Sequence, residues 1–246
     1  MIEELYTSGE YLKKNPTWHV GESPWKAREI LRMMARNKIA PKTICEIGCG
    51  AGEILRLLQK KLGSECIFWG YEISPQAFEL CQSRGNERLH FKLGDITQEQ
   101  DVPFDLILVM DVLEHMEDYF SFLRAIQSKS QYKIFHIPLD ISVRSVLLGH
   151  FNEYRDNYGH VHYFTKETAL RRLHDVGYQV LDYSYTTEFI PLPWYEINRN
   201  PRLLLRKILG KIKRGLLGVP KKLFSTIHED FTVRILGGRR LLVLAK

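Results

Sequence analysis

The chain has 246 residues, of which 44% are hydrophobic and 26% are charged, and its formal net charge is +6. A chain of this length can bury a full core, and we expect a single α/β domain over residues 1–246. No run approaches ~18 apolar residues, which excludes a membrane-spanning helix, and the start lacks a secretory signal, which favours a cytoplasmic location.

From Thr43 onward, strand and helix signals alternate, as in a parallel β-sheet that carries helices on both faces. Residues 106–110 are continuously apolar, which is typical of a central parallel strand. The other expected strands are 43–47, 66–73, 89–93, 132–137, 178–185 and 241–245. Helices are expected at 53–62, 75–84, 116–128 and 166–176, with Pro75 opening the second and Gly177 ending the last.

The most informative stretch follows the first expected strand and reads Glu46-Ile47-Gly48-Cys49-Gly50-Ala51-Gly52. Glycine lets the backbone approach a ligand closely and adopt positive φ, and the helix that follows offers unpaired N–H groups. Glu72 lies 20 residues beyond Gly52, at the end of the second expected strand. An acid there accepts hydrogen bonds from ribose hydroxyls. The pattern predicts a turn that binds a nucleotide cofactor.

The glycine spacing separates two classes of cofactor. The dinucleotide fingerprint is G-x-G-x-x-G, whereas this chain reads G-x-G-x-G after an acid, which disfavours NAD. Here the chain resembles the class I S-adenosylmethionine-dependent methyltransferases, whose first motif has that form. The resemblance continues, in the order of the family's motifs, through Gly70–Ser74, Gly94–Ile96 and Phe104–His115.

The resemblance covers about residues 43–185 and the last strand, and it is closest to the bacterial small-molecule branch with a Leu-Glu-His motif. It implies a Rossmann-like, seven-stranded sheet that is parallel except for an antiparallel last strand, with helices on both faces and a small helical cap. It also implies which residues contact S-adenosylmethionine. These are Gly48, Gly50, Gly52, Glu72, Ile73, Asp95, Ile96, Met110, Asp111 and His115.

Glu46 has two interpretations, which the sequence leaves open. Its carboxylate can contact the amino group of the cofactor, or it can accept hydrogen bonds from the N–H groups of the turn itself. Both place Glu46 beside the glycines, and we expect it in the cofactor site.

Histidines are the candidate catalytic residues. Methyl transfer from a sulfonium depends mainly on positioning, and a base is needed only where the acceptor loses a proton. His136 ends the fifth expected strand, while His160 and His162 lie in a later loop and share one side if that loop is extended. The alternative for these histidines is a hydrogen bond that fixes the loop.

Trp18, Lys26 and Tyr163 are candidate substrate contacts. Trp18 and Lys26 precede the core in residues 1–39, which the resemblance identifies as an N-terminal lid. Packing on the sheet edge explains the tryptophan equally well, and most lysines are solvated.

Asp111, Glu114, Glu117 and Asp118 surround His115, a composition that suits a metal ion. The family has an equivalent Leu-Glu-His stretch without metal, and Glu114 and Asp118 would share one helix face. We therefore expect helix capping and solvation, and no metal centre.

Residues 188–230 are expected to form an inserted cap between core segments 40–187 and 231–246, because long unstructured loops are uncommon in compact domains. Ile197–His228 carries nine Lys and Arg and no Asp or Glu, and residues 200–222 predict a basic amphipathic helix. Such a helix suits packing on its own domain, peripheral contact with an anionic membrane, or an acidic acceptor. Nucleic acid is disfavoured, because interleaved aromatic residues for base stacking are lacking.

The leading hypothesis is methyl transfer from S-adenosylmethionine to a small-molecule or lipid-linked acceptor at oxygen, in the cytoplasm or at a membrane surface. One alternative is a regulatory or scaffold protein that binds the cofactor without turnover, and another is an NAD-dependent oxidoreductase. An apolar-lined cavity beside Met110 and His160 would favour the enzyme.

Overall fold

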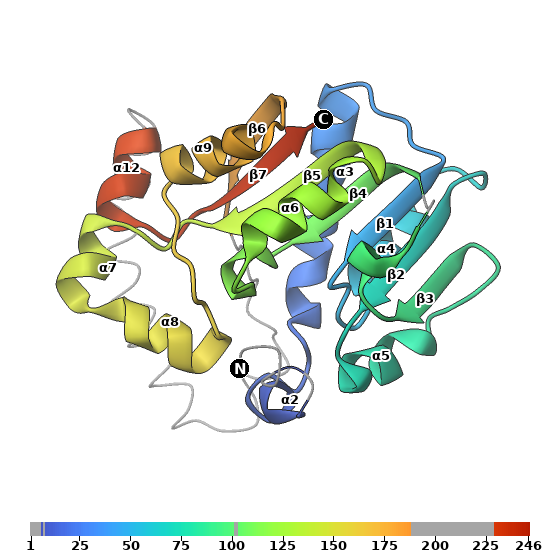
Figure 1. The fold of residues 1–246 in the computed structure, drawn as a ribbon, viewed down its shortest axis with the longest axis horizontal. Coiled ribbons are helices and arrows are strands. Elements are labelled where there is room, and N and C mark those ends of the chain that lie inside the picture. Colours follow the sequence, from blue (N-terminus) through green and yellow to red (C-terminus); the bar gives the residue numbers. More distant parts are fainter. Residues whose placement is uncertain (1–5, 7, 101–102, 188–228) are drawn as a thin grey trace, which may run out of the picture.

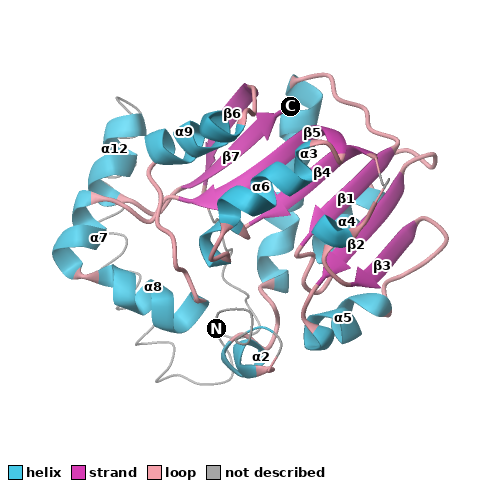
Figure 2. Cartoon of the chain, in the orientation of Figure 1, coloured by secondary structure: helices cyan, strands magenta, loops and turns pink. Residues whose placement is uncertain are grey.

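The computed structural model describes residues 6, 8–100, 103–187 and 229–246. A seven-stranded sheet in the order β3-β2-β1-β4-β5-β7-β6 forms the middle layer, with helices on both faces (Figures 1 and 2). The strands are β1 (Thr43–Ile47), β2 (Ile67–Glu72), β3 (Leu89–Leu93), β4 (Phe104–Met110), β5 (Ser130–Pro138), β6 (Val180–Thr186) and β7 (Arg240–Ala245).

Strand pairing confirms the predicted fold class. The pairs β3–β2, β2–β1, β1–β4 and β4–β5 are parallel, while β7 is antiparallel to both β5 and β6. This is the Rossmann-like sheet with an antiparallel last strand that the resemblance implied. Among the described residues, no helix has the length and apolar character needed to cross a bilayer.

The helices differ more from expectation than the strands do. They are α2 (Glu10–Lys14), α3 (Ser23–Arg36), α4 (Glu53–Gln59), α5 (Pro75–Gln82), α6 (Tyr119–Gln127), α7 (Val143–Leu148), α8 (His150–Tyr158), α9 (Lys166–Val176) and α12 (Glu229–Leu236), with 3-10 turns η1 (Val20–Glu22), η2 (Ile96–Gln98) and η3 (Leu113–His115). The helix expected at 116–128 begins only at Tyr119, because the Asp118 side chain accepts the N–H of Ser121 at 3.0 Å and caps it there. The predicted cap, except for its last two residues, lies outside the described residues.

The core has two halves, one on each face of the sheet. Alternate residues of β4 reach opposite sides, so Leu106 and Leu108 pack with α3 and α4, whereas Ile107 and Val109 pack with α6 and α9. This explains why β4 is apolar at every position from Leu106 to Met110, as expected for a stretch that is buried on both faces.

The carboxyl ends of the parallel strands share one edge of the sheet, which faces α2 and α8 (Figure 1). The strand order reverses between β1 and β4, so the connections that leave these strands diverge and open a crevice. The predicted cofactor turn follows β1 and therefore lies at this crevice.

Candidate functional site

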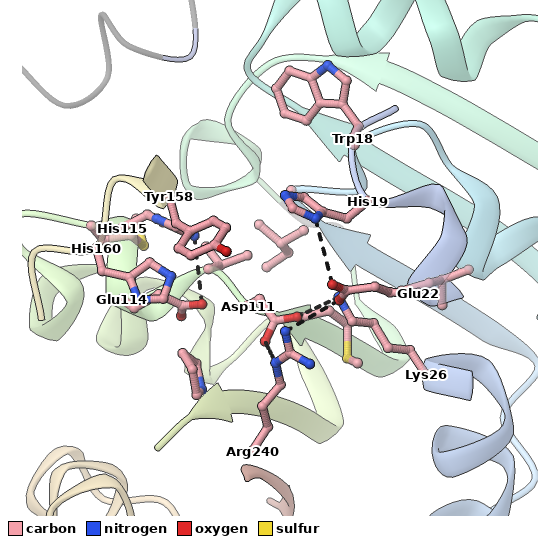
Figure 3. A pocket seen from close by; sticks show the side chains of 18 of the residues that line it. Trp18, His19, Glu22, Lys26, Asp111, Glu114, His115, Tyr158, His160 and Arg240 are labelled. Atoms are coloured by element: carbon pink, nitrogen blue, oxygen red, sulfur yellow. Dashed lines mark ion pairs between the residues drawn. The ribbon is translucent and has the colours of Figure 1, made fainter. Parts of the chain in front are cut away.

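A cavity of about 1670 Å³ occupies this edge of the sheet. Its walls include residues that follow each of the parallel strands, together with residues of α2, η1 and α8. Within it, one group of side chains contains Glu114, His115 and His160, and a separate charged group lies around Asp111 (Figure 3).

The glycine turn after β1 is tied to the end of β2. The N–H groups of Gly48 and Cys49 donate to the carbonyl of Tyr71 at 2.8 and 3.1 Å. Gly48, Gly50 and Gly52 all have positive φ, at 66°, 54° and 73°, which is the conformation that favours glycine. The turn therefore presents its backbone directly to the cavity.

Glu72 is 4% exposed, and its two carboxylate oxygens accept the N–H groups of Gly50 at 2.7 Å and Ser74 at 2.9 Å. Burial raises the pKa of Glu72, while the backbone hydrogen bonds oppose that rise. The structure thus brings Glu72 against the glycine turn, as the sequence predicted, and each oxygen keeps a further lone pair for a ligand hydroxyl.

Glu46 lines the same part of the cavity and is 2% exposed. Its Oε2 has no hydrogen-bond partner, because the N–H groups of the turn donate to Tyr71, Glu72 and Cys49 instead. Burial raises the pKa of Glu46 well above its usual range. An unpaired buried carboxyl oxygen fits the amino group of the cofactor, and the role of Glu46 stays a prediction.

The remaining predicted cofactor residues also reach the cavity. Ile73, Asp95, Ile96 and Met110 line it, and Asp95 uses its carboxylate to accept the N–H of Thr97 at 2.8 Å. Their individual roles stay predictions.

Asp111 is the centre of the charged group. It has a φ of 55°, rare for a residue other than glycine, and is held by Lys26 Nζ at 2.7 Å and by His136 Nδ1 at 2.7 Å. Burial alone would raise its pKa, but the charges of His136 and Lys26 outweigh burial and keep the pKa well below its usual range. Asp111 is thus an ionised, positioned carboxylate at the cavity wall.

Lys26 and His136 are already engaged by the protein. Lys26 Nζ also contacts Glu22 Oε2 at 2.8 Å, so carboxylates of the chain match its charge. His136 uses its second ring nitrogen for Thr186 Oγ1 at 2.9 Å, and it does not belong to the cavity lining. These contacts suit residues that position Asp111 better than residues that take a proton or bind substrate.

The two candidate catalytic histidines of the loop, His160 and His162, differ in their position relative to the cavity. His160 lines the cavity, with Nδ1 2.7 Å from Asp140 Oδ2. His162 lies outside the lining, with Nε2 3.3 Å from the Glu117 carbonyl. The loop is not an extended strand, because the N–H groups of Val161 and His162 both donate to the Glu114 carbonyl and bend the backbone.

The predicted substrate residues also differ in whether they line the cavity. Trp18 lines the cavity beside the glycine turn, where a Cβ built on Gly50 would lie 3.8 Å from its ring. Tyr163 does not line it, and its hydroxyl donates to the carbonyls of Phe151 at 2.9 Å and His160 at 3.2 Å. Tyr163 therefore holds the loop that carries His160.

Two acidic expectations have different outcomes. Asp118 caps α6 as expected. Glu114 is 1% exposed, so the expectation that it is solvated is wrong. Glu114 lies in the 3-10 turn η3, before α6 begins, and its side chain is buried there. Burial raises the pKa of Glu114 well above its usual range.

Sequence reasoning missed an aromatic wall formed by the N-terminal segment and α8. The ring centroid of Tyr11 lies 4.8 Å from that of Tyr6 and 5.0 Å from that of Trp18. The ring centroid of Tyr158 lies 5.7 Å from that of His160. These tyrosines carry no motif, and residues distant in sequence form the wall. The clustering of Tyr6, Tyr11 and Trp18 ahead of the core was the available signal, and Tyr158 of α8 had none.

Comparisons with known proteins identify the family and the fold. A family model described as "Methyltransferase domain" matches residues 22–183. Norajmaline N-methyltransferase of Rauvolfia serpentina is 31% identical over 91 residues, which is 34% of this chain and 30% of that protein. The mitochondrial ubiquinone biosynthesis O-methyltransferase of Schizosaccharomyces pombe is 33% identical over 101 residues, which is 38% of this chain and 36% of that protein.

Each of these alignments spans only about a third of the relative's length. Among solved structures, magnesium protoporphyrin IX methyltransferase of Synechocystis PCC 6803 with bound SAH, S-adenosylhomocysteine, has a TM-score of 0.55 at 16% identity. The alignment covers 70% of this chain and 80% of that one, and it shows a shared fold.

Proposed function

Because this chain belongs to the methyltransferase domain family, with residues 22–183 matching its model, we propose that it transfers the methyl group of S-adenosylmethionine to an oxygen of a small-molecule acceptor. The observation that carries the proposal is the joint placement of the glycine turn, Glu72 and the unpaired Glu46 oxygen at one end of a large cavity.

The residues at this end fit the cofactor expected for the family. The turn offers close backbone approach, Glu72 offers lone pairs to ribose hydroxyls, and Glu46 offers an unpaired carboxyl oxygen to an ammonium group. When bound, S-adenosylmethionine supplies an electrophilic methyl group on a sulfonium whose leaving thioether is neutral. Asp111, Lys26 and His136 keep the adjoining wall rigid, because each is held by at least one charged partner.

The other end of the cavity suits the acceptor. Aromatic rings of Tyr11 and Tyr158 offer flat apolar surface, and His160 is the predicted catalytic histidine that reaches the cavity. Asp140 holds Nδ1 of His160, so Nε2 is the ring nitrogen left to take a proton. This arrangement supports His160 as the residue that engages the acceptor hydroxyl.

The size of the cavity favours turnover over a purely regulatory role. A scaffold protein that only binds the cofactor needs no second compartment, yet the cavity extends from Met110 to His160 and beyond to Tyr154. An NAD-dependent oxidoreductase is disfavoured by the glycine spacing and by the family match.

We further propose a lipid-linked acceptor and peripheral contact with an anionic membrane through residues 200–222. Helix α7 supports this, because Leu147 and Leu148 are 78% and 59% exposed while Ser142 and Ser145, at its start, line the cavity. An apolar acceptor tail could thus leave the cavity beside an apolar surface. The cytoplasmic location stays a prediction.

Calorimetric titration with S-adenosylmethionine, S-adenosylhomocysteine and NAD in parallel tests the proposed cofactor. We expect stoichiometric binding of the first two and none of NAD. Glu72→Ala should weaken binding at least about tenfold by removing charge-assisted hydrogen bonds, and Glu72→Gln, which keeps an acceptor oxygen, should weaken it less. Absence of binding by the wild-type chain would refute the proposed function.

A further inference from the structure

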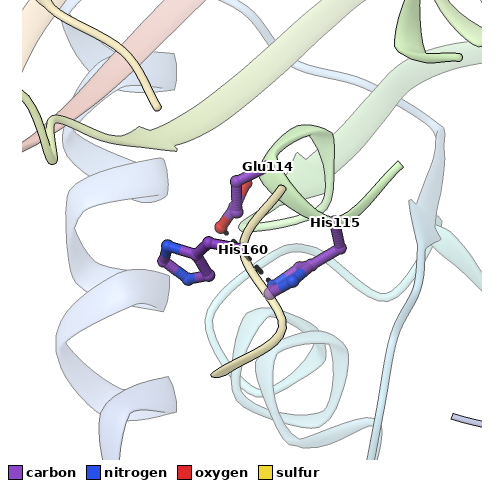
Figure 4. A group of neighbouring side chains, drawn as sticks. All are labelled: Glu114, His115 and His160. Atoms are coloured by element: carbon purple, nitrogen blue, oxygen red, sulfur yellow. Dashed lines mark ion pairs between the residues drawn. The ribbon is translucent and has the colours of Figure 1, made fainter. Parts of the chain in front are cut away.

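A side-chain cluster at the cavity wall joins Glu114, which has no predicted ligand, to His115, a predicted cofactor contact, and to His160, which the proposed function places at the acceptor. Glu114, His115 and His160 place one ligand atom each within 4.8 Å of one another (Figure 4). Glu114 and His115 come from η3 and His160 from the loop after α8, so the fold brings together residues that are separated by 45 positions or more in the sequence.

Glu114 is the first reason to regard this cluster as a ligand site. Its side chain is almost fully buried, it lines the cavity, and its Oε2 has no hydrogen-bond partner. A buried carboxylate without a partner costs free energy, which a bound cation would recover. The Oε1 atom lies 3.7 Å from His115 Nε2.

The orientation of His115 is the second reason. The Tyr6 hydroxyl donates to the Tyr158 carbonyl at 3.2 Å and lies 2.8 Å from His115 Nδ1, so its oxygen is left to accept the Nδ1–H of that ring. This tautomer gives Nε2 a lone pair, and Nε2 is the nitrogen that faces Glu114.

His160 is held in the same manner by a carboxylate. Its Nδ1 lies 2.7 Å from Asp140 Oδ2, so Nδ1–H donates to Asp140 and Nε2 carries the lone pair. Metal-binding histidines characteristically donate their other ring N–H to a carboxylate or a comparable acceptor. Both histidines of this cluster therefore have the outer hydrogen bonds of metal ligands.

We propose that Glu114, His115 and His160 bind a divalent transition-metal ion of the Zn²⁺ type, with an open coordination position toward the acceptor. Two imidazoles and one carboxylate favour Zn²⁺ over Mg²⁺, which prefers oxygen ligands. Three protein ligands with a free position form the usual arrangement of a catalytic zinc site.

The distances require only a small adjustment. Zn²⁺ binds nitrogen at about 2.0–2.1 Å, so neighbouring ligands of a tetrahedral ion lie about 3.4 Å apart. The 3.7 Å between Glu114 Oε1 and His115 Nε2 is close to this value. The widest pair of the cluster, within 4.8 Å, must close by about 1 Å, which side-chain rotation of His160 or Glu114 can supply.

The role of the ion rests on the proposed function. An acceptor hydroxyl bound to the cation releases its proton to solvent more readily, because the positive charge stabilises the oxyanion. Its lone pair forms the new O–C bond to the methyl group of S-adenosylmethionine, while the C–S bond breaks and its electron pair returns to sulfur. The products are the methylated acceptor, S-adenosylhomocysteine and one proton.

The first test measures binding of Zn²⁺ alone to untagged, EDTA-treated protein by calorimetry, with Mg²⁺ in parallel. We expect one Zn²⁺ per chain and at least tenfold weaker Mg²⁺ binding. Glu114→Gln and His160→Asn should each weaken Zn²⁺ binding at least tenfold. His162→Asn is the matched control two residues away in the same loop, and it should bind Zn²⁺ like the wild type.

A positioning role for Asp140 provides a second readout. Asp140→Asn keeps the side-chain shape but loses the charged acceptor of His160 Nδ1–H, and we expect Zn²⁺ affinity to fall about 10–100-fold. Thermal unfolding and S-adenosylmethionine titration of each variant establish that the fold and the cofactor end remain intact.

Two results would overturn the metal site: no stoichiometric Zn²⁺ binding by the wild type, or equal Zn²⁺ affinity in wild type and His160→Asn. If EDTA-treated protein binds S-adenosylmethionine and methylates its acceptor at the full rate, the metal inference also fails, and His160 then acts directly as the base. That outcome leaves the proposed function standing, whereas loss of S-adenosylmethionine binding by the wild type refutes the function itself.

Discussion

Acidic residues around the cavity lie in contrasting surroundings. Asp111 forms ion pairs with Lys26 and His136 that stabilise its charge, whereas Glu46 and Glu114 each bury an oxygen without a hydrogen-bond partner and without a Lys or Arg of the described residues in ion-pair contact. Burying an unpaired polar atom costs about 1–3 kcal/mol. The protein therefore keeps destabilising groups at the cavity, as expected where a ligand completes the missing contacts.

Glu46→Gln should show this cost directly. The folded-state pKa of Glu46 is raised above its ordinary value of 4.5. As pH rises above that value, the unfolded chain releases the proton first, so the free energy of unfolding falls. Replacing Glu46 by Gln should thus raise the free energy of unfolding at pH 7 by about 1–3 kcal/mol but not at pH 4, while weakening S-adenosylmethionine binding.

Urea unfolding at pH 4 and pH 7 measures this difference. Exposed Glu65 offers a matched control, and Glu65→Gln should change the unfolding free energy little at either pH. An equal effect of Glu46→Gln at both values of pH would contradict the explanation by ionisation.

The sequence predicted the residues of the site that lie close together along the chain, but not the contacts between residues of separate elements. The glycines and Glu72 were recognised because their spacing is itself the signal. The contacts of Lys26 with Asp111 and of Asp140 with His160 join separate elements, so no spacing revealed them. The same reason explains why Glu114 was expected to be solvated: its burial depends on the loop that carries His160.

At the scale of elements, the turn from β1 to α4 combines conformational and steric requirements. Gly52 has a φ of 73°, and a Cβ there would lie 2.5 Å from the ring of Phe91 and 3.0 Å from Cys81. The turn thus fixes how closely α4 packs against β3 and α5. Any side chain at this position must shift the surface that faces the cofactor.

Gly52→Ala should lower the free energy of unfolding by about 2 kcal/mol or more, because left-handed φ alone costs alanine about 1–2 kcal/mol. It should also weaken S-adenosylmethionine binding. Gly63→Ala is the control, since Gly63 has open space at its Cβ and no left-handed φ. Thermal unfolding of both variants measures the difference, and equal stability would contradict the steric argument.

Strands were predicted to within about two residues at each end, whereas α7 and α8 were missed. Strands β4 and β7 are buried and carry strong apolar runs. Helix α8 buries none of its residues, and α7 exposes most of its apolar ones, so neither shows the one-sided pattern that indicates a helix. The boundary of α6 depended on the Asp118 cap.

At the scale of the whole molecule, one sheet edge carries both compartments of the cavity, and α7 presents apolar side chains beside it. The basic segment 200–222 adds positive charge to the same chain. The resemblance implied seven strands with an antiparallel last one, but strand signals alone do not specify which strands are neighbours, so the order comes from the structure.

Sedimentation with anionic liposomes tests the proposed membrane contact. The wild type should co-sediment at low ionic strength, and reversing Lys207, Lys211 and Arg214 to Glu should weaken binding at least about 100-fold, since each basic residue contributes about 1 kcal/mol. S-adenosylmethionine affinity should stay unchanged in this variant. If the wild type does not sediment, or sediments equally with neutral liposomes, the electrostatic contact is refuted.

Strand β7 lies between β5 and β6 in the sheet, although residues 187–239 separate it from β6 along the chain. During translation, β6 therefore leaves the ribosome before the strand that it pairs with, and the edge of β5 stays open until residues 240–245 emerge. Open edges recruit foreign strands. Each newly made chain thus passes through an interval in which the edge of β5 is unpaired. In that interval a chaperone that covers the edge would prevent aggregation most effectively.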